Sequence, residues 1–594
     1  MATPNPTQQT WDPVSLANQL QSVAEQSQKL LNGFLSAQPN SGQIGMGDAS
    51  TLGGAFFDLM TKMMSDPTAL ANAQINLINE GMTVWRHAAE RMFLGRESEA
   101  APKDKRFKHP DWTENAVFSF IRESYVVAAK SVLSSVHDVK DLDPATARKV
   151  DFYTRQYVDA ISPSNFIATN PEVLTTTLQT GGQNLLRGLE NLLSDLDRGE
   201  GRLAITMTDK SAFRLGENIA TTPGKVVFQN DLMQLIQYDP ATPDVRRRPL
   251  LIIPPWINKF YVLDLQPKNS FIKWAVDQGH TVFVISWVNP DERLAKKNFE
   301  DYMLEGPLAA LEAIEKATGE RSVNAVGYCL GGTLLASTLA YLAAHDDDRI
   351  ASATYFVTLV DFTEVGDMGV FIDDEQISSL EKRMQERGYL EAQDMATSFN
   401  MLRANDLIWS FVVNNYLLGK EQIPFDLLFW NSDATRMPAA MHSFYLRNMY
   451  QRNLLAKPGG VTLAGTPIDL TKIKTPTFLL STREDHIAPW KSTYAATRLY
   501  GGPVKFVLSA SGHMAGVISA PGSKYGHWTN DDLPPTPDAW LAGAQSHPSS
   551  WWPHWDEWVT AFDLGRVAAR APGDGELPAI ENAPGSYVRV RSDG

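Results

Sequence analysis

The chain has 594 residues, of which 43% are hydrophobic and 20% charged, a balance typical of globular proteins with more than one domain. A net charge of −15 excludes an extended nucleic-acid-binding surface and a general attraction to anionic membranes. The single cysteine excludes an intrachain disulfide framework, and the longest apolar runs are too short for a transmembrane helix.

The N-terminal third has mainly helical patterning. Its first residues, MATPNPTQQTWDPVS, lack the basic start and apolar core of a secretory signal, so we expect a cytoplasmic protein. Residues 16–35 predict a weakly amphipathic helix, and residues 36–54 form a Gly/Ser/Asn-rich linker. Helix is also predicted over residues 56–95, with a break near Pro67, and after a charged stretch it continues to about Leu196.

We therefore predict a mainly helical domain over residues 1–205, in which the segment SPSNFIATNPEV is a turn-rich interruption. The block at residues 56–95 is rich in methionine and other apolar side chains. Such a surface either packs within the helical domain or contacts a dimer mate, another partner or a hydrophobic surface. Both interpretations remain open from the pattern alone.

From about Gly201 onward, short β-branched runs alternate with helical segments such as GGTLLASTLAYLAAH. This alternation predicts a mostly parallel sheet with helices on both faces, hence an α/β domain over residues 206–594. The predicted strands are at residues 249–255, 281–287, 323–327, 353–362, 475–481 and 504–510.

An insertion of about a hundred residues, 363–470, separates the fourth and fifth predicted strands and is too long for a simple connection. Because it follows the carboxyl end of a strand and is rich in aromatic residues, we predict that it forms a cap or lid. The Trp-dense segment AWLAGAQSHPSSWWPHWDEWV near the C-terminus is interpreted as a set of structural anchors.

The lone cysteine, Cys329, is the central residue of GYCLG, which is the G-x-S-x-G nucleophile elbow with Cys in place of Ser. It directly follows a predicted strand and precedes a predicted helix, which is the context that this motif requires. Flanking glycines permit the sharp turn, and the helix N-terminus favours a thiolate. The alternative, an inert core thiol, does not explain this setting.

The other members of a catalytic triad follow in the order that a hydrolase-type sheet requires. Asp485 lies in TREDHIAPW after the fifth predicted strand, and His513 lies in SGHMAG after the sixth. We predict Asp485 as the orienting acid and His513 as the base. Asp361 also ends a predicted strand, and His486 adjoins the predicted acid, but neither shares the full strand-end arrangement.

An acyl-transfer site also needs donors for an oxyanion. The backbone amide of Leu330, next after the nucleophile, is the first candidate, and Ile257 in the loop after LLIIPP is the second. The sequence has no cysteine cluster and no H-E-x-x-H, so we expect no metal site.

Six segments of the chain together resemble a polyhydroxyalkanoate synthase of the class I type. They are GYCLGGT, PPWINKFYVLDLQPKNS, TREDHIAPW, SGHMAGVI, FDLLFWNSDAT and WLAGA...SSWWPHW. The resemblance spans most of the chain and implies an α/β-hydrolase fold with a lid, preceded by a helical N-terminal domain. The family's nucleophile, acid and base fall on Cys329, Asp485 and His513. Its characteristic tryptophan falls on Trp430, which we assign to the substrate channel. Because coenzyme A carries phosphates, we also assign Arg403 in MLRAND to this channel, although a solvated helix face is an equally good explanation of this arginine.

This resemblance implies an acyltransferase that polymerises (R)-3-hydroxyacyl-coenzyme A, expected to be the short-chain 3-hydroxybutyryl thioester, into polyester with release of coenzyme A. The acyl group would be carried as a thioester on the cysteine. Coenzyme A is then part of the substrate, and no cofactor is expected. The resemblance also implies a homodimer that works at the surface of a polyester granule, with granule-coating proteins as partners.

Two other functions compete with this one. An intracellular polyester depolymerase or thioesterase would use the same triad, but we expect it to lack the long N-terminal part and the FDLLFWNSDAT segment. A granule-coating or scaffold protein with a relic fold would show a broken triad or elbow, and neither is broken in the sequence.

Overall fold

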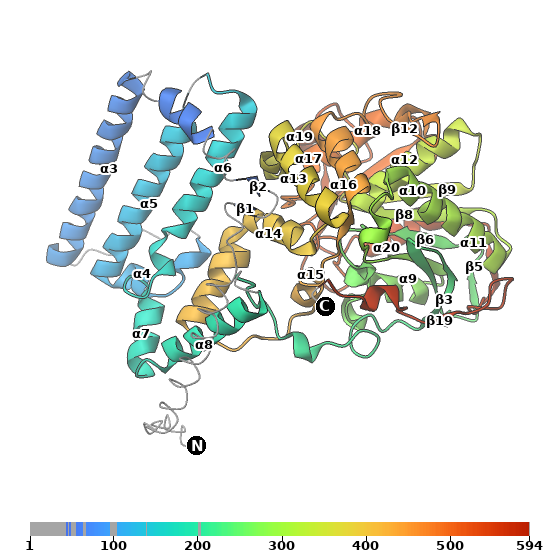
Figure 1. The fold of residues 1–594 in the computed structure, drawn as a ribbon, viewed down its shortest axis with the longest axis horizontal. Coiled ribbons are helices and arrows are strands. Elements are labelled where there is room, and N and C mark those ends of the chain that lie inside the picture. The colour runs from blue at the N-terminus through green and yellow to red at the C-terminus, as the bar shows by residue number, and fades with distance from the viewer. Residues whose placement is uncertain are drawn as a thin grey trace, which may run out of the picture. The chain divides into compact units, whose positions relative to one another are not determined.

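The computed structural model describes residues 43–44, 47–48, 55–62, 67–94, 104–137, 139, 141–199 and 203–592 (Figure 1). The helix predicted at residues 16–35 lies outside these ranges. The chain divides into two compact units, each of which is described below by itself. The first unit holds mainly Leu52–Thr208 with Arg403–Ile423, and the second holds mainly Asp209–Leu402 with Pro424–Gly594.

The first unit is helical. Its helices are α3 (Pro67–Leu94), α4 (Asp111–Glu114), α5 (Ala116–His137), α6 (Pro144–Ala160), α7 (Pro171–Gln179) and α8 (Gln183–Arg198). Helix α5 packs against both α3 and α6. Asp143 and Asn170 cap α6 and α7, each followed by a proline that suits the first helical turn. The predicted turn-rich interruption is confirmed, because only a short 3₁₀ turn, Pro163–Asn165, lies between α6 and α7.

The segment Arg403–Ile423 packs with these helices, although we expected it in the lid over the α/β domain. It contains two π-helical turns, η9 (Asn405–Trp409) and η10 (Val412–Leu417). The Asn184 side chain donates to the Leu417 carbonyl at 2.7 Å, and a Cβ added to Gly188 would lie 1.8 Å from the Tyr416 carbonyl oxygen. These close backbone contacts explain why the segment belongs to the helical unit. The boundaries that we assigned to the two domains remain a prediction.

The second unit is built on an eleven-stranded sheet with the order β17-β16-β15-β14-β9-β8-β6-β7-β4-β3-β19. The six strands from β15 to β7 are parallel and confirm the six predicted strands. They are β6 (Leu250–Ile253), β7 (Val282–Trp287), β8 (Val323–Tyr328), β9 (Ile350–Phe356), β14 (Thr477–Thr482) and β15 (Val504–Ser509).

Antiparallel strands extend the sheet at both ends, and we did not predict them. They are β3 (Gly224–Gln229), β4 (Met233–Tyr238) and β19 (Glu581–Asn582) at one end, and β16 (His527–Thr529) and β17 (Gln545–His547) at the other. The mixed sheet with helices around it has the architecture of the α/β-hydrolase fold, which confirms the predicted fold class (Figure 1).

The Trp-dense segment anchors helix α20 (Trp552–Thr560) to the sheet, as predicted. Trp551, Trp552 and Trp555 are fully buried. The Trp555 indole donates to the Thr354 hydroxyl of β9 at 2.9 Å.

The parts of the predicted insertion that remain in this unit are mainly helical. They include α13 (Asp374–Arg387), α14 (Ala392–Leu402), α15 (Asp426–Asn431), α16 (Ala439–Tyr445) and the π-helical turn η11 (Leu446–Gln451). In the described ranges, no helix is both long enough and apolar enough to cross a membrane.

Candidate active site

Cys329 forms the sharp turn between β8 and helix α12 (Leu330–Ala344). Its backbone has φ 51° and ψ −116°, a conformation that non-glycine residues rarely adopt and that is typical of a nucleophile elbow. The turn is held by the Cys329 amide, which donates to the Phe356 carbonyl of the neighbouring strand β9 at 2.8 Å. The residue is only 9% exposed, so its thiol lies in a largely buried site.

The two glycines that follow Leu330 are needed because the start of helix α12 lies very close to neighbouring strands and loops. They are not needed for unusual backbone angles. A Cβ on Gly331 would lie 2.0 Å from the Ile253 carbonyl oxygen at the end of β6. A Cβ on Gly332 would lie 1.9 Å from the Thr358 hydroxyl oxygen. Helix α12 can therefore begin directly over the ends of the neighbouring strands only because these positions lack side chains.

The structure brings the predicted acid and base together. His513 Nδ1 and Asp485 Oδ2 are 2.7 Å apart, and both residues are buried. The other Asp485 oxygen accepts hydrogen bonds from the backbone amides of Ile487 and Ala488 at 2.8 and 2.9 Å. Because these bonds fix the carboxylate, it can hold the His513 ring in one orientation.

The environment of His513 favours the protonated ring. Burial opposes the charge, but the negative charge of Asp485, its hydrogen bond to the ring and the nearby Cys329 raise the pKa of His513 to about 10. The cysteine therefore lies within electrostatic reach of this histidine. The three side chains form one coupled group.

The two rival residues have other contacts. Asp361 accepts hydrogen bonds from the Thr363 amide at 2.9 Å and from the Asn453 side chain at 2.8 Å, so its carboxylate holds a loop together. The imidazole that is hydrogen-bonded to Asp485 belongs to His513 and not to His486.

The two amides predicted for the oxyanion lie in suitable local structures. Leu330 is the first residue of α12, where backbone amides have no acceptor within the helix. Ile257 lies in the loop after β6, the strand that pairs with β8.

Hydrogen bonds fix the loop that carries Ile257. The Thr435 amide donates to the Ile257 carbonyl at 3.2 Å, and the Trp430 indole donates to the Lys259 carbonyl at 2.7 Å. The Lys259 ammonium group in turn donates to the carbonyl of Val590 in the C-terminal segment. Trp430, which we predicted in the substrate channel, thus has an observed contact that pins this loop.

Sequence reasoning missed three tyrosines around the cysteine. Burial, followed by the Cys329 charge, raises the pKa of Tyr328 and of Tyr450, and Cys329 also contributes to a raised pKa of Tyr445. The Tyr328 ring stacks on the His513 ring, with centroids 5.8 Å apart.

Tyr445 and Tyr450 are five residues apart and have ring centroids separated by 5.6 Å. A π-helical turn brings residues five apart onto one face, whereas a search for α-helical spacing does not pair them. An i, i+5 tyrosine pair is the signal that could have revealed them.

Arg403 belongs to the helical unit, where its guanidinium pairs with Asp406. Its predicted contact with the substrate remains a prediction. Among the described residues, no group of three or more His, Cys, Asp or Glu side chains is arranged to hold a metal ion.

Comparison with known proteins agrees with both units. Residues 103–275 match the family described as "Poly-beta-hydroxybutyrate polymerase (PhaC) N-terminus", and residues 248–518 match "alpha/beta hydrolase fold". The chain is 53% identical over 533 residues to the poly(3-hydroxyalkanoate) polymerase subunit PhaC of Rhizobium meliloti, a match that covers 89% of this chain and 87% of that protein. The chain belongs to the poly(3-hydroxyalkanoate) polymerase family.

Two further polymerases give matches of similar extent. Identity to the poly(3-hydroxyalkanoate) polymerase of Methylorubrum extorquens is 51% over 558 residues, which covers 92% of both chains. Identity to the poly(3-hydroxyalkanoate) polymerase subunit PhaC of Cupriavidus necator is 41% over 559 residues, which covers 93% of both. The predicted family and acyltransferase activity are confirmed, and the depolymerase, thioesterase and scaffold alternatives are not supported.

Proposed function

We propose that this polymerase uses Cys329 as nucleophile, His513 as acid and base, and Asp485 as the orienting carboxylate, with (R)-3-hydroxybutyryl-coenzyme A as its substrate. The observation that carries the proposal is the buried His513–Asp485 hydrogen bond at 2.7 Å beside a cysteine in a strained elbow. Leu330 and Ile257 are proposed as the oxyanion donors.

The first half-reaction transfers the acyl group to the enzyme. His513 takes the proton from Cys329, and the sulfur attacks the thioester carbonyl as a thiolate. The new carbon–sulfur bond forms as the bond to coenzyme A breaks. The departing coenzyme A thiolate then takes the proton from His513.

Acylation itself prepares the histidine for its second role. Once Cys329 is a thioester, it no longer carries the negative charge that helps to raise the pKa of His513. Burial and Asp485 remain, so the pKa falls and the ring can act as a base.

The second half-reaction forms the ester. His513 removes the proton from a 3-hydroxyl group, whose oxygen attacks the acyl carbon on Cys329. The carbon–sulfur bond breaks and the thiolate–imidazolium pair returns. A thioester retains enough reactivity to drive ester formation, which a serine ester would not.

Exclusion of water decides between polymer and free acid. The buried tyrosines Tyr328 and Tyr445 flank the cysteine with aromatic surface. We propose that they, with the insertion, keep water from the acyl-enzyme.

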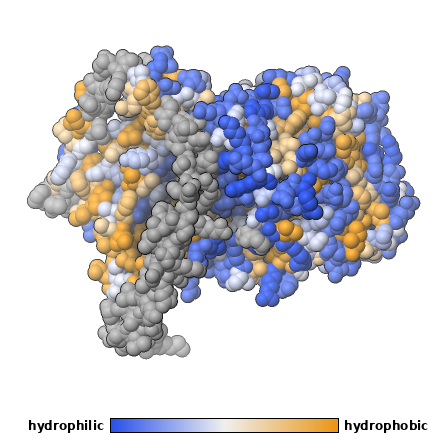
Figure 2. All heavy atoms as spheres, in the orientation of Figure 1, coloured by the Kyte–Doolittle hydropathy of each residue, from blue (hydrophilic) through white to orange (hydrophobic). Residues whose placement is uncertain are grey.

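Association with a polyester granule is also proposed, with a homodimer and granule-coating proteins as partners. Helix α3 presents Ile75, Ile78, Met82 and Trp85, spaced 3, 4 and 3 residues apart and each more than half exposed. This spacing puts them on one face of the helix. Figure 2 shows apolar residues gathered on the helical unit. An apolar stripe of this kind supports contact with a hydrophobic surface or a second subunit.

The test is turnover of 3-hydroxybutyryl-coenzyme A and of longer 3-hydroxyacyl thioesters, with free thiol and polymer measured together. We expect release of coenzyme A with insoluble polyester, fastest for the short chain, and neither product with Cys329→Ala. Asp361→Asn, which keeps an acceptor for the Asn453 side chain, is the matched control and should retain activity. Release of coenzyme A with only free hydroxy acid would contradict the proposal.

A further inference from the structure

His513 lies in a short helical turn of the loop between β15 and β16. The Gly516 amide closes this turn by donating to the Gly512 carbonyl at 2.8 Å. At the start of the loop, the Glu484 amide donates to the Ser511 carbonyl at 2.9 Å, which ties the loop to the one that carries the acid. A single helical turn leaves its last carbonyls without amide donors of its own, so other parts of the chain must supply them.

Two tryptophans of the C-terminal segment supply such donors. The Trp551 indole donates to the Gly516 carbonyl at 2.9 Å, and the Trp552 indole donates to the Val517 carbonyl at 2.9 Å. All four residues are buried, so bulk water would not replace a lost donor. The Ser509 hydroxyl at the end of β15 also donates to the Gly516 carbonyl, at 2.8 Å. The turn is thus held by its own strand and by a segment 35 residues further along the chain.

Trp551 also contacts the strand that holds the nucleophile. Its ring packs edge-on against the Phe356 ring of β9, with centroids 5.0 Å apart and an interplanar angle of 67°. The Phe356 carbonyl is the acceptor of the Cys329 amide at the elbow, at 2.8 Å. One side chain therefore contacts both the turn that carries His513 and the residue that fixes the backbone of Cys329.

The position of Trp551 is itself fixed. Its ring stacks on that of Phe271 in helix α9 (Phe271–Asp277), with centroids 5.9 Å apart. The preceding segment is attached to the edge of the sheet, where β17 pairs with β16 and where His527 Nδ1 lies 2.8 Å from the Ser549 carbonyl oxygen. Because the indole cannot move without loss of these contacts, it gives the turn a rigid support.

We propose that Trp551 is a positioning residue that sets the distance between His513 and Cys329 by holding the Gly516 carbonyl. The inference deepens the proposed function and rests on it, because His513 and Cys329 are the proposed base and nucleophile. Proton transfer from the thiol to the imidazole requires the two atoms within hydrogen-bonding reach. A small shift of the turn therefore slows the reaction and leaves the binding of substrate unchanged.

The single cysteine allows a test that needs no substrate. Iodoacetamide alkylates a thiolate, so the rate of its reaction with Cys329 reports how well His513 accepts the proton. Trp551→Phe keeps an aromatic ring and loses the indole donor. We expect its alkylation rate at pH 7 to fall about threefold or more, toward that of His513→Ala. In turnover, kcat should fall roughly tenfold, with KM within about twofold of the parent.

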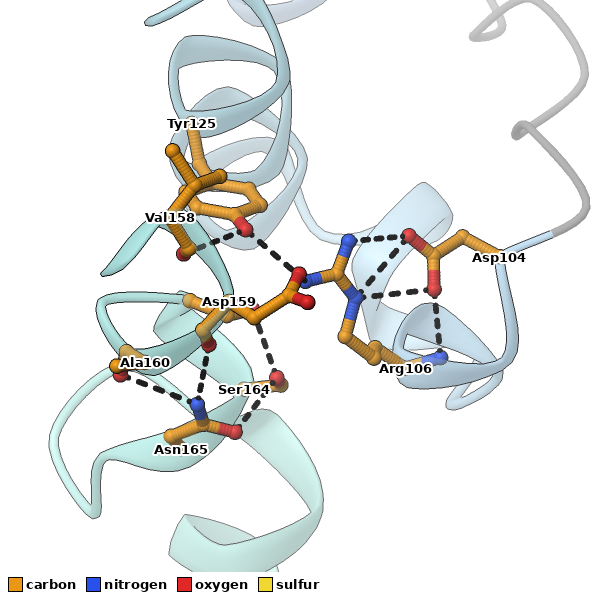
Figure 3. A network of polar contacts seen from close by, with 9 residues as sticks. Asp104, Arg106, Tyr125, Val158, Asp159, Ala160, Ser164 and Asn165 are labelled. Carbon is orange, nitrogen blue, oxygen red and sulfur yellow. Dashed lines mark hydrogen bonds and ion pairs between the residues drawn. The ribbon is translucent and has the colours of Figure 1, made fainter. Parts of the chain in front are cut away.

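Two control variants separate this role from a general loss of stability. Trp555→Phe removes a buried indole from the same segment, but that indole donates to the Thr354 hydroxyl and not to the loop. Tyr125→Phe removes a hydroxyl from the network of the helical unit shown in Figure 3, where it accepts from Arg106 at 2.9 Å and donates to the Val158 carbonyl at 3.0 Å. Both controls should melt at a lower temperature and still react with iodoacetamide and turn over at the parent's rates.

An alkylation rate and a kcat of Trp551→Phe equal to the parent's would overturn the inference, and so would an equal loss in Trp555→Phe. If circular dichroism shows that Trp551→Phe is unfolded, Trp552→Phe makes the same test at the next carbonyl. Alkylation of His513→Ala at the parent's rate would instead contradict the proposed function, and the role of Trp551 would be rejected with it. His513→Ala therefore distinguishes failure of the proposed function from failure of this inference alone.

Discussion

Replacement of Asp485 with Asn removes one buried negative charge and keeps an oxygen that can accept from the Ile487 and Ala488 amides. The raised pKa of His513, about 10 against an ordinary 6.5, corresponds to roughly 5 kcal/mol in favour of the protonated ring. Asp485 is the leading cause that raises it, while burial acts in the opposite direction. We expect the variant to bind substrate but to turn over about 10³- to 10⁴-fold more slowly, because the ring loses both its orientation and its stabilised positive charge.

Thermal unfolding across pH provides an independent readout of the same charge. A histidine whose folded-state pKa is raised contributes stability that is fully present below pH 6.5 and is lost as the pH rises through about 10. The difference in melting temperature between the parent and Asp485→Asn should therefore be largest near pH 6 and shrink toward pH 10. Turnover within tenfold of the parent, or a difference in melting temperature that does not change with pH, would refute the role assigned to Asp485.

Three further changes test other parts of the structure. Gly331→Ala places a methyl group 2.0 Å from the Ile253 carbonyl oxygen, so circular dichroism and turnover should show a destabilised protein with at least a tenfold loss of activity. Lys259→Met removes the hydrogen bond to Val590 behind the proposed oxyanion loop. We expect kcat to fall several-fold with little change in KM, because the loop would position the oxyanion donor. A KM that rises as much as kcat falls would argue against this positioning role. Trp85→Lys on α3 should reduce sedimentation with polyester granules while the specific activity of the protein in solution is retained; undiminished sedimentation would remove this stripe from the granule contact.

The parallel part of the sheet could be predicted because its strands are continuous apolar runs. The predicted strand at 353–362 ends earlier, at Phe356, because Val357 adopts a positive φ of 45° and turns the chain away. The antiparallel strand β4 was missed because Gln234 and Gln237 look like surface residues in the sequence. Both are buried in the structure, where their amides donate to distant partners, including the Arg570 carbonyl.

In the active site too, features that depend on local sequence patterns could be predicted, whereas features that depend on contacts between distant parts of the chain could not. The elbow around Cys329 and the strand-end positions of Asp485 and His513 are local patterns, and the structure brings the acid and base together. The membership of Arg403–Ile423 in the helical unit depends on contacts across more than two hundred residues, such as Asn184 with Leu417, which no local pattern encodes.

The central claim, that the growing acyl chain is carried on Cys329, can be tested directly by mass spectrometry. The polymerase would be mixed with 3-hydroxybutyryl-coenzyme A, quenched in acid within the first turnovers and digested. The account predicts a 3-hydroxybutyryl adduct on the peptide that contains Cys329, which neutral hydroxylamine removes as it does other thioesters. An adduct on a different residue, or one that survives hydroxylamine, would contradict it.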